Sequence, residues 1–195
     1  MQDKNYFFHD TAFIDEGAII GAGSKVWHFS HIMNGSVLGK NCNIGQNVVI
    51  SPQVILGENC KVQNNVSIYT GVICDDDVFL GPSVVFTNVI NPRSSVIRRG
   101  QYSKTHIRKG ASIGANATVV CGNDIGEYGF VGAGAVVTKS IKPYALVVGN
   151  PAKQIGWISR YGHKLNFFKG FAQCSESMDW YKLEDDMVYF LGKNK

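Results

Sequence analysis

The chain has 195 residues, 45% hydrophobic and 17% charged, and its 19 Lys and Arg against 15 Asp and Glu give a formal net charge of +4. This length suits one large domain or one domain with an appendage, and the mild charge without a dense basic stripe argues against a nucleic-acid partner. The N-terminal sequence MQDKNYFFHD lacks the apolar segment of a secretion signal, and no apolar run approaches the ~18 residues of a membrane span, so we expect a soluble, cytoplasmic protein. The five cysteines show no framework spacing, which favours free thiols in a reducing compartment.

A six-residue repeat runs from Phe8 to Asn91 without a slip, in units such as IDEGAI, IGAGSK, VWHFSH and LGPSVV. Its first place is almost always a large apolar residue, and its fifth place is small or branched. A period of six matches neither the 3.6 of a helix nor the 2 of a simple strand, whereas hexapeptide repeats are a known form of β-solenoid. The repeat therefore predicts an all-β chain of triangular coils of about 18 residues each, about seven in number, stacked at about 4.8 Å with both places pointing inward.

Glycine often follows the first place of the repeat, as at Gly21, Gly39 and Gly57. We interpret these glycines as positions where the coil needs backbone angles that other residues adopt with difficulty.

The hexad VWHFSH places His28 and His31 three residues apart, across one predicted corner. Either the two histidines hydrogen-bond neighbouring coils, or one of them faces a ligand at a subunit interface. No third histidine follows in matching phase, so we expect no metal site here. The acidic run Asp75 to Asp77 is interpreted as a solvated turn.

The repeat breaks between Asn88 and His106 and resumes at Ile107. A long insertion in a strict repeat is a loop that leaves the stack at one corner, and such loops often carry function. Its cations suit phosphate or carboxylate recognition, although a merely solvated loop would look the same. The cations are Arg93, Arg98, Arg99 and Lys104.

The end of the repeat is rich in small residues, and Gly132 to Ala135 leave room for a ligand along the outside of the coils. Lys139, Lys142 and Lys153 could meet its phosphates. After Trp157 the composition becomes aromatic and charged, which favours short antiparallel strands that cap the stack, with a helical tail as the alternative. We divide the chain into a β-helix over residues 1–155 and a cap over residues 156–195.

The hexads, together with GAGAVVT and GNPAK, resemble the left-handed parallel β-helix acyltransferases. VWHFSHI, VFTNVINPR, THIRKGASIGANATVV and ALVVGNPAKQIGWI are similar to the UDP-2-acetamido-3-amino-2,3-dideoxy-glucuronate N-acetyltransferases, over roughly residues 8–165. The resemblance implies a homotrimer with active sites between subunits. It also implies transfer of acetyl from acetyl-CoA to the 3-amino group of a UDP-linked uronic acid for bacterial surface polysaccharide.

By this resemblance, Asn88 matches the family position that holds the amine. The other expected roles follow from residue chemistry: His28 or His31 would contact the sugar or assist proton transfer, and Arg93 or Arg98, with Pro92 beside them, would bind the substrate's carboxylate or diphosphate. Backbone N–H groups near Gly114 and Gly132 would hold the pantetheine arm, and Lys139 and Lys153 would lie near the phosphates of CoA. Some relatives carry paired cysteines in the tail, but only Cys174 stands here, so we expect no zinc.

Two alternatives stay open. The acceptor is another nucleotide 3-amino sugar, such as a dTDP-3-amino-6-deoxyhexose, or a hydroxyl group. Alternatively the solenoid is a structural or metal-binding protein without this activity.

Overall fold

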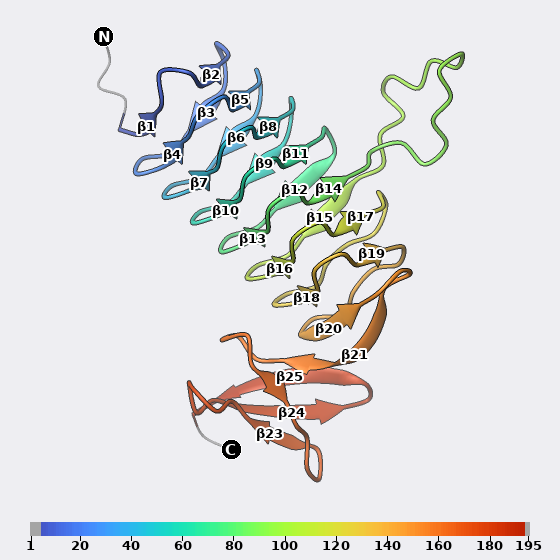
Figure 1. Ribbon diagram of the computed structural model, residues 1–195. Coiled ribbons are helices and arrows are strands. Elements are labelled where there is room, and N and C mark those ends of the chain that lie inside the picture. The colour runs from blue at the N-terminus through green and yellow to red at the C-terminus, as the bar shows by residue number, and fades with distance from the viewer. Residues whose placement is uncertain (1–4, 194–195) are drawn as a thin grey trace.

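The computed structural model describes residues 5–193, which form a stack of triangular coils without any helix (Figure 1). No helix in this range is therefore long and apolar enough to cross a membrane. Three parallel sheets make the three sides of the prism, and we call them face 1, face 2 and face 3 in the order in which the chain visits them. The corners are named by the faces that they join.

Face 1 stacks eight parallel strands before two antiparallel ones complete its sheet. Its parallel strands are β1 (Phe7–Phe8), β4 (Lys25–Val26), β7 (Asn43–Ile44), β10 (Lys61–Val62), β13 (Phe79–Leu80), β16 (Ser112–Ile113), β18 (Phe130–Val131) and β20 (Ala145–Val148). Face 2 consists of β2 (Phe13–Ile14), β5 (His31–Ile32), β8 (Val49–Ile50), β11 (Ser67–Ile68), β14 (Val85–Phe86), β17 (Thr118–Val119) and β19 (Val136–Val137). Face 3 consists of β3 (Ile19–Ile20), β6 (Val37–Leu38), β9 (Ile55–Leu56), β12 (Val72–Cys74) and β15 (Thr105–Ile107). The count agrees with the predicted solenoid of about seven coils.

The core confirms the predicted inward places of the hexad. First-place residues such as Ile32, Ile44 and Ile68 are fully buried and stack on their equivalents in the coils above and below. Fifth-place residues at the corners are buried too. Serine is tolerated there because it bonds the adjacent coil: the buried Ser30 hydroxyl donates to the carbonyl of Gly45 at 2.6 Å and accepts the N–H of Val48 at 3.0 Å.

The interpretation of the second-place glycines is wrong. Gly21, Gly39 and Gly57 do not have positive φ; a Cβ at Gly39 would lie 2.6 Å from the backbone of Gly57 in the next coil. Glycine is needed there because stacked corners approach closely. Positive φ occurs instead at the fourth place of the hexad, which holds Gly17, Gly23, Phe29, Gly35, Asn41, Asn47, Gln53, Asn59, Asn65, Gly71, Asp77 and Ser83.

The interruption is a loop, as predicted. It leaves face 2 after β14 and returns to face 3 at β15, so it replaces one copy of corner 2/3 and projects away from the stack (Figure 1).

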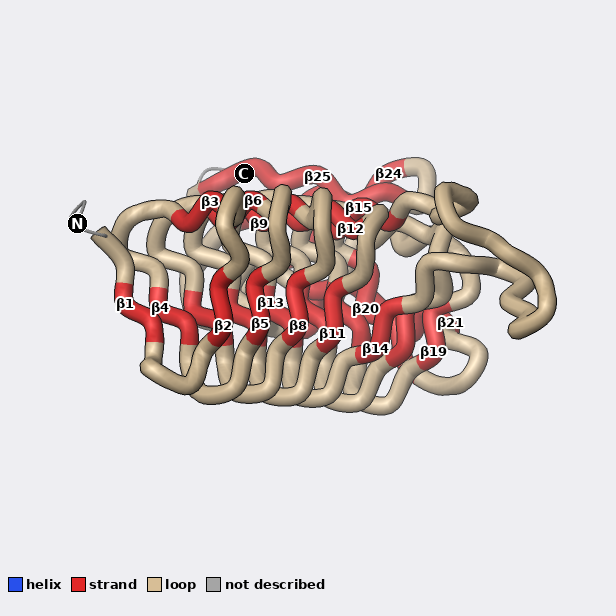
Figure 2. Tube along the Cα trace, turned by 90° about the horizontal axis from the view of Figure 1, so that it is seen from above, coloured by secondary structure: helices blue, strands red, loops and turns tan. Residues whose placement is uncertain are grey.

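The tail folds as strands, not as the helix that was the alternative. β21 (Lys153–Ile158) and β22 (Lys164–Leu165) pair antiparallel at the edge of face 1, and β23 (Phe171–Gln173), β24 (Trp180–Glu184) and β25 (Met187–Gly192) form a separate antiparallel sheet (Figure 1; β24 and β25 are also labelled in Figure 2). The expected boundary at 155/156 falls inside β21. The division into two domains therefore stays a prediction. Residues 1–4 of the first predicted domain and residues 194 and 195 of the second lie outside the described range.

Candidate active site at the loop corner

Asn88 lies at the neck of the loop, directly after face 2 ends. Its backbone carbonyl accepts a hydrogen bond from the N–H of Ser103 at 2.9 Å, which joins the two ends of the loop. Next to it, the hydroxyl of Thr87 accepts the N–H of Cys121 from the coil above at 2.9 Å. Asn88 is half-buried, and these two hydrogen bonds hold the backbone that carries its side chain.

The loop is strongly cationic because residues 88–106 contain no Asp or Glu. Arg93 is exposed and bonds the carbonyl of Pro92 at 3.1 Å, within its own turn. Arg98 is half-buried; it donates to Gln101 at 3.2 Å, while its buried Nε has no partner among the described residues. A buried donor without an acceptor is costly, and an anionic ligand would satisfy it.

A pocket of about 520 Å³ opens at the base of the loop, on the side of face 3. The body contributes Gln53, Thr70, Gly71 and Ile73, and the loop contributes Gly100, Tyr102 and Lys104. Asn88, Arg93 and Arg98 do not line this pocket within one chain.

The structure separates His28 and His31 from the loop. His28 sits at corner 1/2, with its ring stacked on His9 at 3.5 Å between centroids and its buried Nδ1 without a partner in the described chain. His31 faces outward on face 2 and bonds Asp15 at 2.7 Å, and this hydrogen bond, with one from the N–H of Asn34, lowers the pKa of Asp15. His31 and the end of β14 are three strands apart along face 2, or about 14 Å at the usual spacing. One chain therefore does not bring either histidine to Asn88.

The residues expected to bind CoA are also distributed over different corners. Gly114 and Gly132 lie at corner 1/2, whereas Lys139 follows β19 at corner 2/3 and Lys153 opens β21. Both lysines are exposed. A Cβ at Gly114 would lie 2.5 Å from the backbone N of Ala133, so coil stacking alone requires glycine there.

The hydrogen-bonded pair of His106 and Asp75 was not predicted from the sequence. His106, which faces outward on β15, bonds Asp75 at 2.6 Å, and its backbone N–H donates to Asp124 at 2.9 Å. The two partners are separated by 31 positions because the loop lies between their coils. Only the parallel pairing of β12 with β15 makes them neighbours. Such a pair fixes the orientation of the imidazole ring.

Comparison with known proteins identifies the family. The family "Bacterial transferase hexapeptide (six repeats)" matches residues 17–52, and "Hexapeptide repeat of succinyl-transferase" matches residues 36–70 and 106–139. The chain is 43% identical to a dTDP-3-amino-3,6-dideoxy-alpha-D-galactopyranose 3-N-acetyltransferase of Aneurinibacillus thermoaerophilus, over 92% of this chain and 95% of that one. The chain belongs to the hexapeptide-repeat acetyltransferases.

The chain is also similar to part of a second acetyltransferase and, in its fold, to a solved structure. A serine acetyltransferase of Buchnera aphidicola is 36% identical over 44% of this chain and 36% of its own. The acetyltransferase domain of PglB from Neisseria gonorrhoeae superposes with a TM-score of 0.50 at 22% identity, over 76% of this chain and 56% of that chain, and shows the shared left-handed parallel β-helix.

As a member of this family, the acetyltransferase takes its acyl group from acetyl-CoA. Between residues 5 and 193, no group of three or more His, Cys, Asp or Glu is arranged to hold a metal ion.

Proposed function

We propose that this enzyme transfers acetyl from acetyl-CoA to the 3-amino group of a nucleotide-linked 3-amino sugar, for bacterial surface polysaccharide. The Aneurinibacillus relative supports this, because it is named as a 3-N-acetyltransferase and aligns over nearly the whole chain. Its name favours a dTDP-3-amino-3,6-dideoxyhexose as the acceptor. The four cations of the acid-free loop favour the second candidate, a UDP-linked 2-acetamido-3-amino-2,3-dideoxy-glucuronic acid, whose carboxylate adds an anion.

The reaction depends more on positioning the amine against the thioester than on a strong general base. The neutral amine attacks the thioester carbonyl, an N–C bond forms, the C–S bond breaks, and the departing thiolate takes the proton that the amine loses. A sugar amine flanked by electron-withdrawing groups is largely free base near neutral pH. Asn88 then orients the amine through its amide, which has no useful pKa of its own. Backbone N–H groups near Gly114 and Gly132 stabilise the oxyanion and hold the pantetheine arm.

The active site, in this proposal, lies between copies of the chain in a homotrimer. Within one chain, Asn88 and the loop occupy corner 2/3, whereas His28, Gly114 and Gly132 occupy corner 1/2, at the opposite edge of face 2. Corner 1/2 of one copy set against corner 2/3 of the next brings the two groups together, and a head-to-tail contact of this kind closes into a ring.

The outward residues of face 2 support such a contact. They form a single ladder column with no Lys, Arg, Asp or Glu: Phe13, His31, Val49, Ser67, Val85, Thr118 and Val136. In contrast, corner 3/1 collects charged residues such as Lys40, Glu58 and Asp76. Depletion of charge is typical of the centre of a protein interface.

The deciding experiment measures free thiol released from acetyl-CoA with a panel of acceptors. The panel contains dTDP-3-amino-3,6-dideoxygalactose, the matching dTDP-4-amino sugar, the UDP-3-amino uronate and its neutral hexose counterpart. We expect turnover with 3-amino acceptors only. A preference for the uronate over its neutral counterpart supports the second candidate, and equal rates remove it. Turnover with none of the amino sugars contradicts the proposed function.

Asn88→Ala should lower kcat by about 100-fold, because the variant lacks the amide that orients the attacking amine. The control is Asn91→Ala, which removes an exposed amide from the same loop and should leave kcat near that of the wild type. Steady-state kinetics of both variants makes the comparison. Near-normal turnover of Asn88→Ala would remove Asn88 from the mechanism.

A further inference from the structure

A second pocket lies far from the loop, where the cap folds against the last coils of the prism. Its volume is about 420 Å³, within the usual range for ligand sites. Face 1 and corner 3/1 contribute Gly110, Ser112, Tyr128 and Phe130, and the start of the cap contributes Ile158, Ser159, Arg160, Tyr161 and Gly162. The loop occupies corner 2/3, so the two pockets lie on different sides of the prism.

Arg160 is the only charged residue among the described residues that line this pocket. Its guanidinium carbon lies 3.6 Å from the ring centroid of Phe190 and 4.8 Å from that of Tyr128. Its Nε donates to the hydroxyl of Tyr144 at 3.2 Å. Among residues 5–193 the guanidinium is therefore fixed by aromatic rings and a phenol rather than by a carboxylate. The two terminal NH2 groups of the planar guanidinium keep the geometry needed to donate paired hydrogen bonds to a phosphate.

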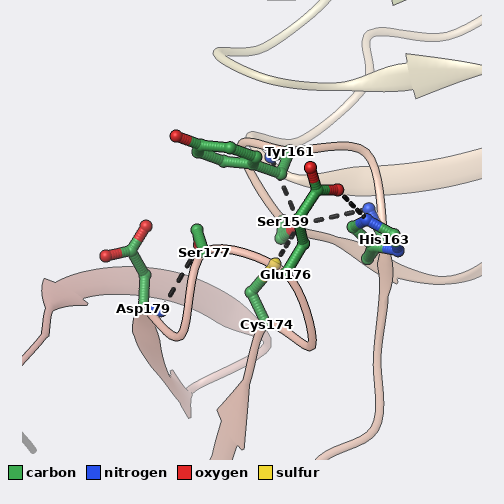
Figure 3. Close-up of polar contacts among 7 residues, drawn as sticks. All are labelled: Ser159, Tyr161, His163, Cys174, Glu176, Ser177 and Asp179. Carbon is green, nitrogen blue, oxygen red and sulfur yellow. Dashed lines mark hydrogen bonds and ion pairs between the residues drawn. The ribbon is translucent and has the colours of Figure 1, made fainter.

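The rim of the pocket is equally well fixed. The chain turns between Ser159 and His163, where the Ser159 hydroxyl accepts the N–H of Tyr161 at 3.3 Å and that of His163 at 3.1 Å (Figure 3). This turn presents the ring of Tyr161, 60% exposed, at the edge of the pocket. An exposed aromatic ring on a rigid turn costs hydration free energy, and stacking with a planar ring would recover it.

We propose that this pocket binds a nucleoside monophosphate, with the phosphate on Arg160 and the base against the exposed ring of Tyr161, since the ring of Tyr128 is already stacked on that of Tyr144. The Ser112 hydroxyl, on the floor beside Phe130, faces the ribose. Base–aromatic stacking and a guanidinium–phosphate pair are the two main contacts that a nucleotide needs. This site is independent of acetyl transfer.

Calorimetric titration of the full chain with UMP, dTMP and AMP tests the proposal. Uridine and inorganic phosphate are titrated separately, because each carries one half of the nucleotide. We expect both halves to bind more weakly than UMP. If uridine binds as tightly as UMP, the phosphate does not sit on Arg160. If inorganic phosphate binds as tightly as UMP, the aromatic contact is absent. Either result, or failure of all three nucleotides to bind, overturns the proposal.

Variants then locate the bound nucleotide. Arg160→Gln should weaken UMP binding about tenfold or more, whereas Arg108→Gln, an exposed arginine at the same corner, should not change it. Because Arg160 also holds the cap, Ser112→Trp fills the pocket without touching the guanidinium and should abolish binding. Its control is Lys25→Trp on the same face. Loss of binding in Arg98→Gln but not in Arg160→Gln or Ser112→Trp would move the nucleotide to the loop and overturn the assignment.

Discussion

At the scale of single residues, environment decides what a cysteine can do. Burial inside the prism raises the pKa of the Cys74 thiol, and the charge of Asp75 adds to this, so Cys74 is a neutral core residue. Cys174 in the cap is equally buried, and burial alone would raise its pKa too. The hydroxyl of Ser159 lies 3.3 Å from the Cys174 sulfur (Figure 3). This hydrogen bond, with others from the Ser177 hydroxyl and two backbone N–H groups, outweighs burial and brings the pKa of Cys174 to about 7.

This difference predicts a pH-dependent contribution of Cys174 to stability. The folded thiol loses its proton near pH 7, whereas an unfolded thiol holds its proton to about pH 8.5. Between these values the unfolded state binds more protons, so stability rises with pH, and the contribution is lost as pH falls through 7. The wild type and Cys174→Ala differ in their free energy of unfolding. When the pH rises from 6.5 to 8.5, this difference should change by about 1–2 kcal/mol in favour of the wild type.

Urea denaturation of the two proteins at both pH values measures this gain. Cys74→Ala is the control, because its thiol is neutral over the whole range and the variant should lose the same stability at each pH. A constant difference between the wild type and Cys174→Ala would show that the hydrogen bonds do not favour the thiolate.

At the scale of the element, each corner imposes two separate demands on its residues. The fourth place of the hexad has positive φ, and Asn fills it repeatedly because Asn tolerates this conformation better than most residues. The second place requires glycine wherever the next coil lies too close for a side chain. The two demands are independent, so substitutions at the two places should differ in cost.

Gly39→Ala should destabilise the protein by about 2–3 kcal/mol, because its Cβ would overlap the backbone of Gly57 and force the coils apart. Gly35→Asn should be nearly neutral, since Gly35 has φ of +73° and, its chain neighbours aside, no atom of the described residues lies within 4 Å of the place that its Cβ would occupy. Thermal unfolding of both variants compares them. Equal melting temperatures would mean that the coils can separate at little cost.

At the scale of the whole molecule, charge is sorted around the prism. Face 2 presents its uncharged column, face 1 carries Lys25 and Lys61, and corner 3/1 carries a group of acidic residues that includes Asp75, Asp76 and Asp77. A monomer gains nothing from an uncharged, partly apolar face, whereas a ring of copies buries it. The same packing would complete the site, because the loop and the glycine corner lie at opposite edges of that face.

If the proposed trimer forms through face 2, Val49→Arg on β8 should shift the protein from trimer to monomer and reduce turnover at least tenfold, since a buried unpaired charge is costly. Phe79→Arg on face 1 is the matched control and should stay trimeric. Light scattering coupled to size exclusion measures the mass. If Ile55→Arg on face 3 dissociates the protein and Val49→Arg does not, the contact runs through face 3 instead.

The repeat alone determined the coil, the inward places and the position of the loop, because a six-residue period leaves one way to stack apolar residues along three faces. It also marked the cationic segment, which stands where the period breaks, whereas the role expected of Asn88 came from the family resemblance. Tertiary structure decided the rest. The reason for the second-place glycines, the His106–Asp75 pair and the pocket around Arg160 all depend on residues 16 or more positions apart, which only the stacked coils and the folded cap bring within contact distance. Local sequence fixes what each residue prefers, but neighbours in a solenoid are one coil away, and a loop or a cap changes which residues those are.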